Sequence, residues 1–282
     1  MRGSCYHTTH PAAPLTRVCR RGCSAKMLVR EFVVRIPPFA MFSLEAGALL
    51  PESTVELSIG PGRAADVVAW VRASFFLLGA GDAAGVTEDA LTGGGGLTWR
   101  VLRDGSVLNL RLGGDGQLVV RAGSVQVAGD IIQALASHLG LVDLPAKAFI
   151  PAHTDALAGY VERVGAFNAV RQQLTAAMAD QGSLVKSLVV RAEDARLLGD
   201  MEGVRDAYAQ LRDVNRDLVA SYRIRSSNHA ELLACLRSVN QHIQLAGRLR
   251  VGRAEADLVA ACRRALKGND VPGLLQTIAS GV

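Results

Sequence analysis

The sequence is poor in the residues that build metal centres, disulfide frameworks and aromatic binding pockets. Only 5% of the residues are aromatic, and the five cysteines, Cys5, Cys19, Cys23, Cys235 and Cys262, include no CxxC pair. Cys19 and Cys23 have no further ligands at zinc spacing, so neither a zinc site nor a disulfide framework is indicated. We therefore expect no metal and no cofactor, and we expect a reducing compartment.

Motifs of known catalytic chemistry are also missing. The chain contains no HExxH, GxSxG, Walker or GxGxxG signature, and its six histidines are scattered. Gly60-Pro61-Gly62 lacks the further glycine or Lys-Ser/Thr of a phosphate-binding loop, which favours a plain turn. Glu193 and Asp194 point about 100° apart on a helix, so an ion pair with Arg196 is favoured over acid-base chemistry. We expect no catalytic residue and no enzyme activity.

The features of membrane-spanning and nucleic-acid-binding proteins are weak. The most apolar segment, residues 64–81, is interrupted by Asp66 and Arg72 and falls short of a bilayer span. The net charge is +5, but the first thirty residues carry six basic residues and no acid, so the remaining residues have a net charge of −1. A nearly neutral body offers no basic face for phosphates, which disfavours nucleic-acid binding.

Residues 1–30 form a basic tail without the periodicity of a helix or a strand, and we predict that it is disordered. The absence of acids allows an organelle transit peptide, but no amphipathic stripe is evident. An arbitrary start of the gene model would give the same composition, and we favour that interpretation.

The segment that follows predicts a small α/β domain. Residues 54–59 alternate as a strand, residues 63–78 have an amphipathic helical pattern, and residues 79–96 hold too few large apolar residues to fold. Three short strands separated by Gly-containing turns then lead to a helix over residues 129–139. The predicted order is β-α-β-β-β-α, with both helices on one face of an antiparallel sheet and residues 144–151 as a linker.

Apolar residues at alternating steps of three and four predict a long antiparallel helical hairpin. The first seam is Leu157, Tyr160, Val164, Phe167, Leu174, Met178, Val185 and Leu188. The second seam is Met201, Val204, Tyr208, Leu211, Leu218, Tyr222, Leu232, Leu236, Val239, Ile243 and Ala246. Such a stripe of Met and aromatic residues could also line a cofactor pocket, but helical spacing favours packing.

Asn215, Arg225 and His229 interrupt the second seam and therefore need polar partners. We expect Arg225 to meet an acceptor at or near an intersubunit face. A hydrogen bond within the hairpin or a break in the helix near Ser226-Ser227 is the alternative. The predicted interface residues are Val164, Phe167, Leu174, Leu211, Asn215, Leu218, Arg225, His229, Leu232, Leu236 and Val239.

Several strings in the second half of the chain resemble the C-terminal part of the Bardet-Biedl syndrome protein 2 family. They are AGDIIQ at 128–133, MAD at 178–180, AEDARLL at 192–198, NRDL at 215–218, NHAELL at 228–233 and AGRLRVG at 246–252. Members of that family are subunits of the BBSome, a coat-like complex that carries membrane proteins into and out of cilia. The architecture of that family, from the N-terminus, is a β-propeller, a coiled coil, an adaptin-ear-like β-sandwich, a platform and a C-terminal helical region.

The resemblance implies an α+β fold, with a β-α-β-β-β-α platform domain before a long antiparallel helical hairpin and short C-terminal helices. The implied divisions are residues 1–30 as an unmatched tail, 31–50 as the last strand of a sandwich, 51–148 as the platform, 149–252 as the hairpin and 253–282 as short helices. Because the propeller, coiled coil and most of the sandwich are missing, we expect a fragment or an incomplete gene model.

The function implied by the resemblance is that of a non-catalytic scaffold. Its partners would be other BBSome subunits, chiefly the homologous propeller-platform subunits, with ciliary membrane and cargo reached through the assembled complex and no nucleic acid. The implied location is the cilium, the ciliary base and the cytoplasm. A generic coiled-coil tether without a ciliary role is the alternative, although it offers no reason for the α/β domain.

Overall fold

The computed structural model describes residues 15–16, 33–34, 36–45, 47–77, 85–268 and 270–280. Most of the tail predicted to be disordered therefore lies outside the described residues. The same holds for residues 31–32, 35 and 46 of the predicted sandwich strand, for residue 78 of the predicted helix and for residues 79–84 of the predicted insertion. One short segment of the tail, β1 (Leu15–Thr16), pairs in antiparallel fashion with β2 (Val33–Val34), which follows the tail.

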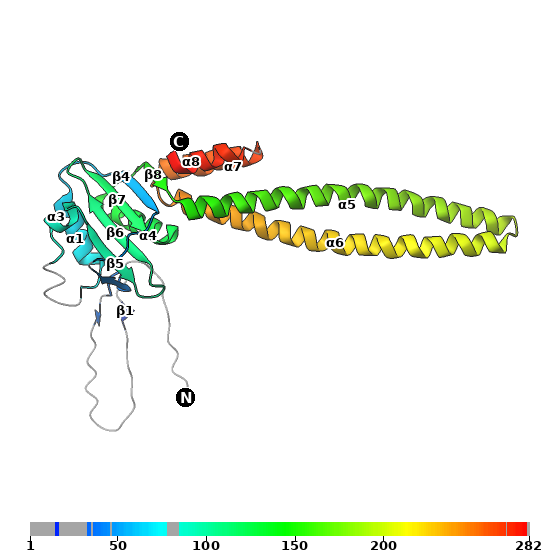
Figure 1. The fold of residues 1–282 in the computed structure, drawn as a ribbon, viewed down its shortest axis with the longest axis horizontal. Helices are drawn as coiled ribbons and strands as arrows, with labels where there is room; N and C mark the ends of the chain where they lie inside the picture. Colours follow the sequence, from blue (N-terminus) through cyan, green and yellow to red (C-terminus); the bar gives the residue numbers. More distant parts are fainter. Residues whose placement is uncertain are drawn as a thin grey trace, which may run out of the picture. The chain divides into compact units, whose positions relative to one another are not determined.

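A six-stranded antiparallel sheet, with the order β3-β5-β6-β7-β4-β8, forms the centre of the N-terminal half (Figure 1). Its strands are β3 (Phe42–Leu44), β4 (Thr54–Ser58), β5 (Leu97–Val101), β6 (Val107–Leu112), β7 (Gln117–Ala122) and β8 (Ala146–Phe149). The helices that the structure describes beside them are α1 (Ala64–Ser74), α3 (Glu88–Thr92) and α4 (Val125–Leu139).

Alternating burial along the strands explains how the helices cover the sheet. Val55 and Leu57 of β4 are buried with Leu118 and Val120 of β7, while Glu56 between them is exposed. Helix α4 packs on β7 and also contacts α1, so both helices lie on the apolar face. The opposite face has exposed charged side chains, as expected for an antiparallel sheet covered on one side. The predicted α+β class and the predicted order of elements are confirmed.

Aromatic residues are few, yet five of them form one cluster in the core. Phe75, at the end of α1, stacks on Trp99 of β5 with ring centroids 4.5 Å apart. Phe39, Phe42 and Trp70 surround Phe75 with centroid distances of 5.1 to 5.7 Å. Tilted and edge-to-face aromatic pairs of this kind add to the stabilisation from apolar burial. The cluster ties α1 to the β3 and β5 edge of the sheet.

Three segments differ from the sequence prediction. Phe42 pairs with Val101, so β3 is an edge strand of this sheet, whereas residues 31–50 were assigned to a separate sandwich. Residues 146–149, predicted as linker, form β8 beside β4, because alternating alanines give only a weak apolar signal. Within the predicted insertion, Thr87 caps the short helix α3, whose Leu91 is buried.

The second half of the chain is helical. Helices α5 (Pro151–Leu197) and α6 (Met201–Gly247) have 47 residues each, and α7 (Arg253–Lys267) and α8 (Val271–Ser280) follow. The described residues divide into two units: a platform unit within residues 1–151, 246–261 and 276–282, and a hairpin unit of residues 152–245 and 262–275.

Among the helices that the structure describes, none has the length and apolar character needed to cross a bilayer.

Candidate interaction surface of the hairpin

The hairpin reverses direction at Leu198-Gly199-Asp200. Gly199 has a φ of +74°, a left-handed conformation that residues with a Cβ adopt only with strain. The backbone N–H of Asp200 donates to the carbonyl of Ala195, which closes the end of α5. The Asp200 carboxylate then accepts from the N–H of Gly203 at 2.9 Å, so it caps the start of α6. These contacts explain the abrupt turn between two long helices.

One row of residues on α6 faces α5, and we call it the inward row. Its members recur at steps of three and four, and all except Arg225 are buried or half-buried. The inward row is Val204, Ala207, Leu211, Val214, Leu218, Ser221, Arg225, Asn228, Leu232, Cys235, Val239 and His242. Three of its polar members contact α5 directly. Many of the others are small, which allows the two helices to lie close together.

The predicted interface residues fall partly inside the hairpin and partly outside it. On α5, Val164, Phe167 and Leu174 are half-buried. On α6, Leu232 and Val239 are buried and Leu211 and Leu218 are half-buried. The remaining predicted residues are exposed: Asn215, Arg225, His229 and Leu236. Arg225 still belongs to the inward row, so the assignment to the hairpin seam is corrected for Asn215, His229 and Leu236.

The error in α6 is a shift of one residue at every second seam position. Tyr208, Tyr222 and Leu236 were predicted to face α5, but the residues before them, Ala207, Ser221 and Cys235, occupy that row. A tyrosine or leucine gives a stronger apolar signal than the alanine, serine or cysteine beside it. The sequence therefore favoured the larger side chain, although the narrow space between the helices accepts the smaller one.

The buried polar residue of the inward row is Asn228 rather than His229. Its side-chain amide donates to the carbonyl of Phe167 on α5 at 3.2 Å, and its Oδ1 has no hydrogen-bond partner among the described residues. Arg225 stays exposed, with Nη1 4.0 Å from Sδ of Met178, which is a weak contact. A single buried asparagine in a helical seam lowers stability but fixes the register. The sequence signal for this residue was a second polar side chain next to His229 in the string NHAELL.

Two histidines pair across the hairpin at the end away from the turn. Nε2 of His153 lies 3.0 Å from the carbonyl oxygen of His242, and the two rings stack with centroids 4.7 Å apart. Burial lowers the pKa of His153 below its usual value, and the neighbouring His242 adds to that effect, while the contact with the His242 carbonyl opposes it. Tyr160 contacts the ring of His242, and Arg163 lies over Tyr160. Burial therefore favours the neutral form of the His153 imidazole.

The charged cluster near the turn has no poised acid or base. The guanidinium of Arg196 donates to both carboxylate oxygens of Glu193, at 2.7 and 2.9 Å, and both side chains are exposed. That hydrogen bond lowers the pKa of Glu193, so its carboxylate is ionised at neutral pH. A general acid would need a raised pKa and a partly desolvated setting. The cluster therefore has the character of a surface ion pair.

No ligand set for a metal ion is assembled in the described part of the chain. Residues 36–45, 47–77, 85–268 and 270–280 contain no group of three or more His, Cys, Asp and Glu side chains placed to hold a metal ion. The platform unit has an open hollow of about 510 Å³, lined by carboxylates such as Glu56 and Asp257 and by cations such as Lys147 and Arg253. Mixed charges of this kind select no ligand class.

Two of the recognised strings contact each other within the platform unit. Asp130 of AGDIIQ pairs with Arg248 of AGRLRVG at 2.7 Å, and the Gln133 amide donates to the carbonyls of Arg248 and Arg250. A Cβ on Gly129 would lie 3.2 Å from Arg248, so the glycine permits this close approach. The Arg250 side chain is 1% exposed and donates to the carbonyls of Ala246 and Ile278. This contact joins α4 to the segment after α6.

Family models match both parts of the chain. The BBS2 platform domain model matches residues 39–139, and the BBS2 hairpin model matches residues 151–248. The first range contains the strands β3 to β7 and the helices α1, α3 and α4 but not β8, and the second contains α5 and α6.

Curated relatives extend the similarity to most of the chain. The chain is 39% identical over 259 residues to "BBSome complex member BBS2" of Danio rerio and 36% identical over 262 residues to that of Homo sapiens. Each alignment covers 92% of this chain but 35% of the relative, so the chain spans about a third of their length. "BBSome complex member bbs-2" of Caenorhabditis elegans is 26% identical over 142 residues. The chain belongs to the BBS2 family.

Proposed function

We propose that this chain acts as a non-catalytic scaffold subunit of the BBSome, the complex that carries membrane proteins to and from cilia. The observation that carries the proposal is the match of both its units to BBS2, whose relatives are named as BBSome members. A sheet-based platform and a long helical hairpin with exposed polar and apolar side chains suit a role in assembly.

The partners that we propose are other BBSome subunits, chiefly the homologous propeller-platform subunits. Membrane and cargo would be contacted by the assembled complex, at the cilium, at its base and in the cytoplasm, without nucleic acid or a cofactor. The hairpin is the proposed contact region, because it presents Asn215, Arg225 and His229 as exposed polar groups beside exposed apolar ones. Such mixed surfaces are typical of protein interfaces.

Affinity purification tests this function. The full chain, with an affinity tag, is expressed in ciliated cells, and the proteins that co-purify at physiological salt are identified by mass spectrometry. We expect BBSome subunits to be enriched at least tenfold over a tagged control protein of similar charge. Recovery of the chain without any BBSome subunit would contradict the proposal, and it would favour a coiled-coil tether of another process.

A matched pair of variants refines the test. Leu232→Glu places a charge in the buried inward row and should disrupt the hairpin, whereas Ala230→Glu changes an exposed position two residues away. If the hairpin carries the contact, the first variant should lose most of the co-purifying subunits and the second should retain them.

A further inference from the structure

Helix α6 carries a second row of apolar side chains that the hairpin leaves exposed, and we call it the outer row. It consists of Met201, Tyr208, Val219, Tyr222, Leu233 and Leu236, whose exposed fractions run from 39% to 67%. Successive members are separated by 3, 7 or 11 residues, and at 3.6 residues per turn these steps keep them on about a quarter of the helix circumference. The outer row therefore lies on one flank of α6, beside the inward row.

The row holds nearly all of the large apolar surface that α6 exposes. Ile224 is the one other large apolar side chain of α6 that is exposed, and it lies on the opposite flank. Scattered exposed apolar residues would need no explanation, but a row with helical periodicity over more than thirty residues indicates a packing surface. Polar residues between its members, Asn215, Ser226 and His229, keep the row narrow, with the width of a contact between two helices.

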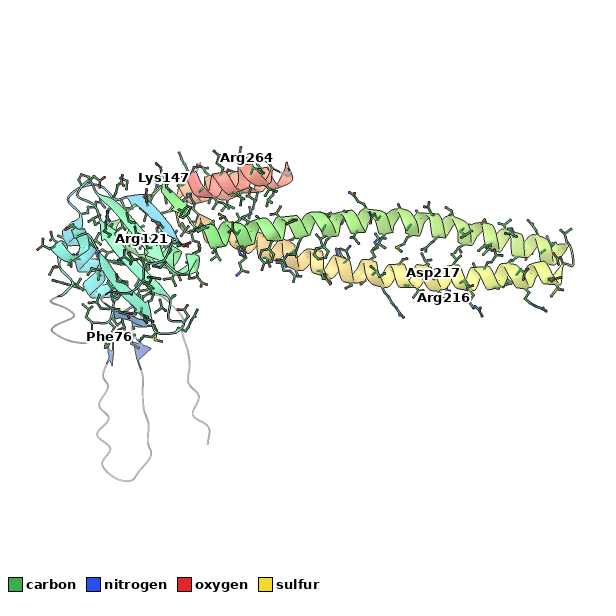
Figure 2. The ribbon with its side chains drawn as sticks, in the orientation of Figure 1. Phe76, Arg121, Lys147, Arg216, Asp217 and Arg264 are labelled. Atoms are coloured by element: carbon green, nitrogen blue, oxygen red, sulfur yellow. The ribbon has the colours of Figure 1, made fainter. Side chains whose placement is uncertain are left out.

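Except for Glu202 in the first turn of α6, the charges along the outer row have one sign. Arginines lie within it or along the edge that faces away from the inward row: Arg205, Arg212, Arg216, Arg223 and Arg237. From residue 203 to residue 245, the acids of α6 lie further round the helix: Asp206, Asp213, Asp217 and Glu231. Figure 2 labels Arg216 at that edge and its neighbour Asp217.

Some of these arginines already have acidic neighbours on α6. Arg212 and Arg216 lie 3.9 and 3.3 Å from the carboxylate of Asp213, in exposed positions where ion pairs contribute little. Arg205, Arg223 and Arg237 form no ion pair with any residue that the structure describes. The flank therefore keeps a positive potential next to its apolar row.

We propose that the outer row docks one amphipathic helix of a partner protein, whose apolar stripe is bordered by Asp and Glu. The apolar row receives the stripe, and the arginines face the acids, as in helical pairs whose partner choice is set by flanking charges. A second copy of this chain does not fit, because its outer row would bring arginine against arginine. The inference rests on the proposed function for its setting, since a neighbouring subunit would supply the helix.

Site-specific photo-cross-linking tests the inference. Tyr222 is replaced by p-benzoylphenylalanine, an aromatic of similar placement, in the full chain expressed in ciliated cells, and Ile224→p-benzoylphenylalanine on the opposite flank is the control. We expect at least fivefold more cross-linked product from position 222. The cross-linked peptide should come from a helical segment in which acidic residues flank an apolar stripe. Cross-links to another copy of this chain, cross-links to lipid, or no excess over position 224 would overturn the proposal.

Charge reversal supplies the second measurement. Arg205→Glu together with Arg223→Glu should reduce the cross-link from position 222 at least fivefold, whereas Glu231→Arg on the other flank should leave it unchanged. All three positions are exposed, so the helical circular dichroism should stay the same, which separates loss of docking from loss of folding. If the double variant and the chain with both arginines give equal cross-link yields from position 222, charge does not select the partner. The assignment of an acidic helix would then fail.

The outcomes separate this inference from the proposed function. BBSome subunits that co-purify while position 222 gives no specific cross-link would retain the function and reject the outer row as a docking surface. An acidic helix cross-linked from a protein outside the BBSome, with no BBSome subunit co-purified, would retain the docking surface and reject the function.

Discussion

The platform unit and the hairpin unit solve the burial problem in different ways. In the platform unit, large side chains such as Trp99, Leu110 and Ile131 are completely buried between a sheet and its helices. In the hairpin unit, most residues between the two helices are half-buried, since two helices alone cannot enclose them. Alternation along a strand shows clearly which of its two faces is buried. On a helix, two neighbouring rows of residues differ by one position in the sequence, so the buried row is harder to identify. The hairpin is thus the harder region to predict, and its helix α6 keeps a periodic row of exposed apolar side chains.

Removal of the central aromatic side chain should give the largest effect. Trp99→Ala should destabilise the platform unit by about 3 to 5 kcal/mol, because the indole stacks on Phe75 and the cavity cannot collapse. Its Nε1 has no hydrogen-bond partner among the described residues, so the loss is one of packing. Hydrogen exchange of the β5 and β6 amides measures the change.

Leu102→Ala, at an exposed position three residues later, is the control for that experiment. It should change stability by about 0.5 kcal/mol or less. Equal effects of the two substitutions would contradict the aromatic core.

The same Leu→Ala substitution at two positions one helical turn apart distinguishes the inward row of α6 from the outer row. Leu232 is 4% exposed and Leu236 is 43% exposed. Leu232→Ala should therefore cost about 2 to 3 kcal/mol, near the lower end for buried leucines, and Leu236→Ala about 0.5 kcal/mol or less in the isolated chain. Thermal unfolding followed by circular dichroism, with hydrogen exchange of α6, measures both. A larger effect at Leu236 would restore the frame that the sequence predicted.

The smallest effect concerns pH at the histidine pair. Burial gives His153 a pKa below its unfolded value of about 6.5. The folded state therefore binds fewer protons than the unfolded state, so stability is complete above about pH 6.5 and falls as the pH drops below it. His242 stacks on His153, Tyr160 contacts the ring of His242, and Arg163 lies over Tyr160.

A comparison of variants isolates that contribution. His153→Phe keeps a ring in the stack and removes the titrating group, so it should reduce the loss of stability between pH 7.5 and pH 5.5. Measurement of melting temperatures at both pH values provides the test. An unchanged pH dependence in this variant would assign the effect to other groups.

The sequence predicted the elements well wherever a single pattern was dominant. Alternation over residues 54–59 identified β4, and the paired seams identified the hairpin and the residues of α5 that are buried or half-buried in it. It did not identify β8, because alanines at 146 and 148 are weakly apolar. It also did not reveal Arg250, since a buried arginine that serves carbonyls 4 and 28 residues away has no local signature.

The candidate site was predicted only in part, and the residues show why. At every second seam position of α6, either of two neighbouring residues could face α5, such as Ala207 or Tyr208 and Asn228 or His229. Hydrophobicity favours the larger apolar member of the first pair, and it does not separate the two polar members of the second. The decision depends on the distance between the helices, which is a property of the partner helix α5 and not of the local sequence. The outer row came into view only once those residues were found to be exposed.

The sharp turn at Gly199 also sets an order of events in the formation of the hairpin. Contacts near the turn, such as Asp200 with Gly203, join residues close in sequence, whereas the His153–His242 contact spans 89 residues. Closing a short loop costs less chain entropy than closing a long one, so the helices should associate first at the turn and proceed toward the histidines. The hydrogen bond from Asn228 to Phe167, which spans 61 residues, should form at an intermediate stage. Helices paired in the wrong register would lack this hydrogen bond before the rest of the hairpin associates. The histidine end would then be the last to close and the first to open.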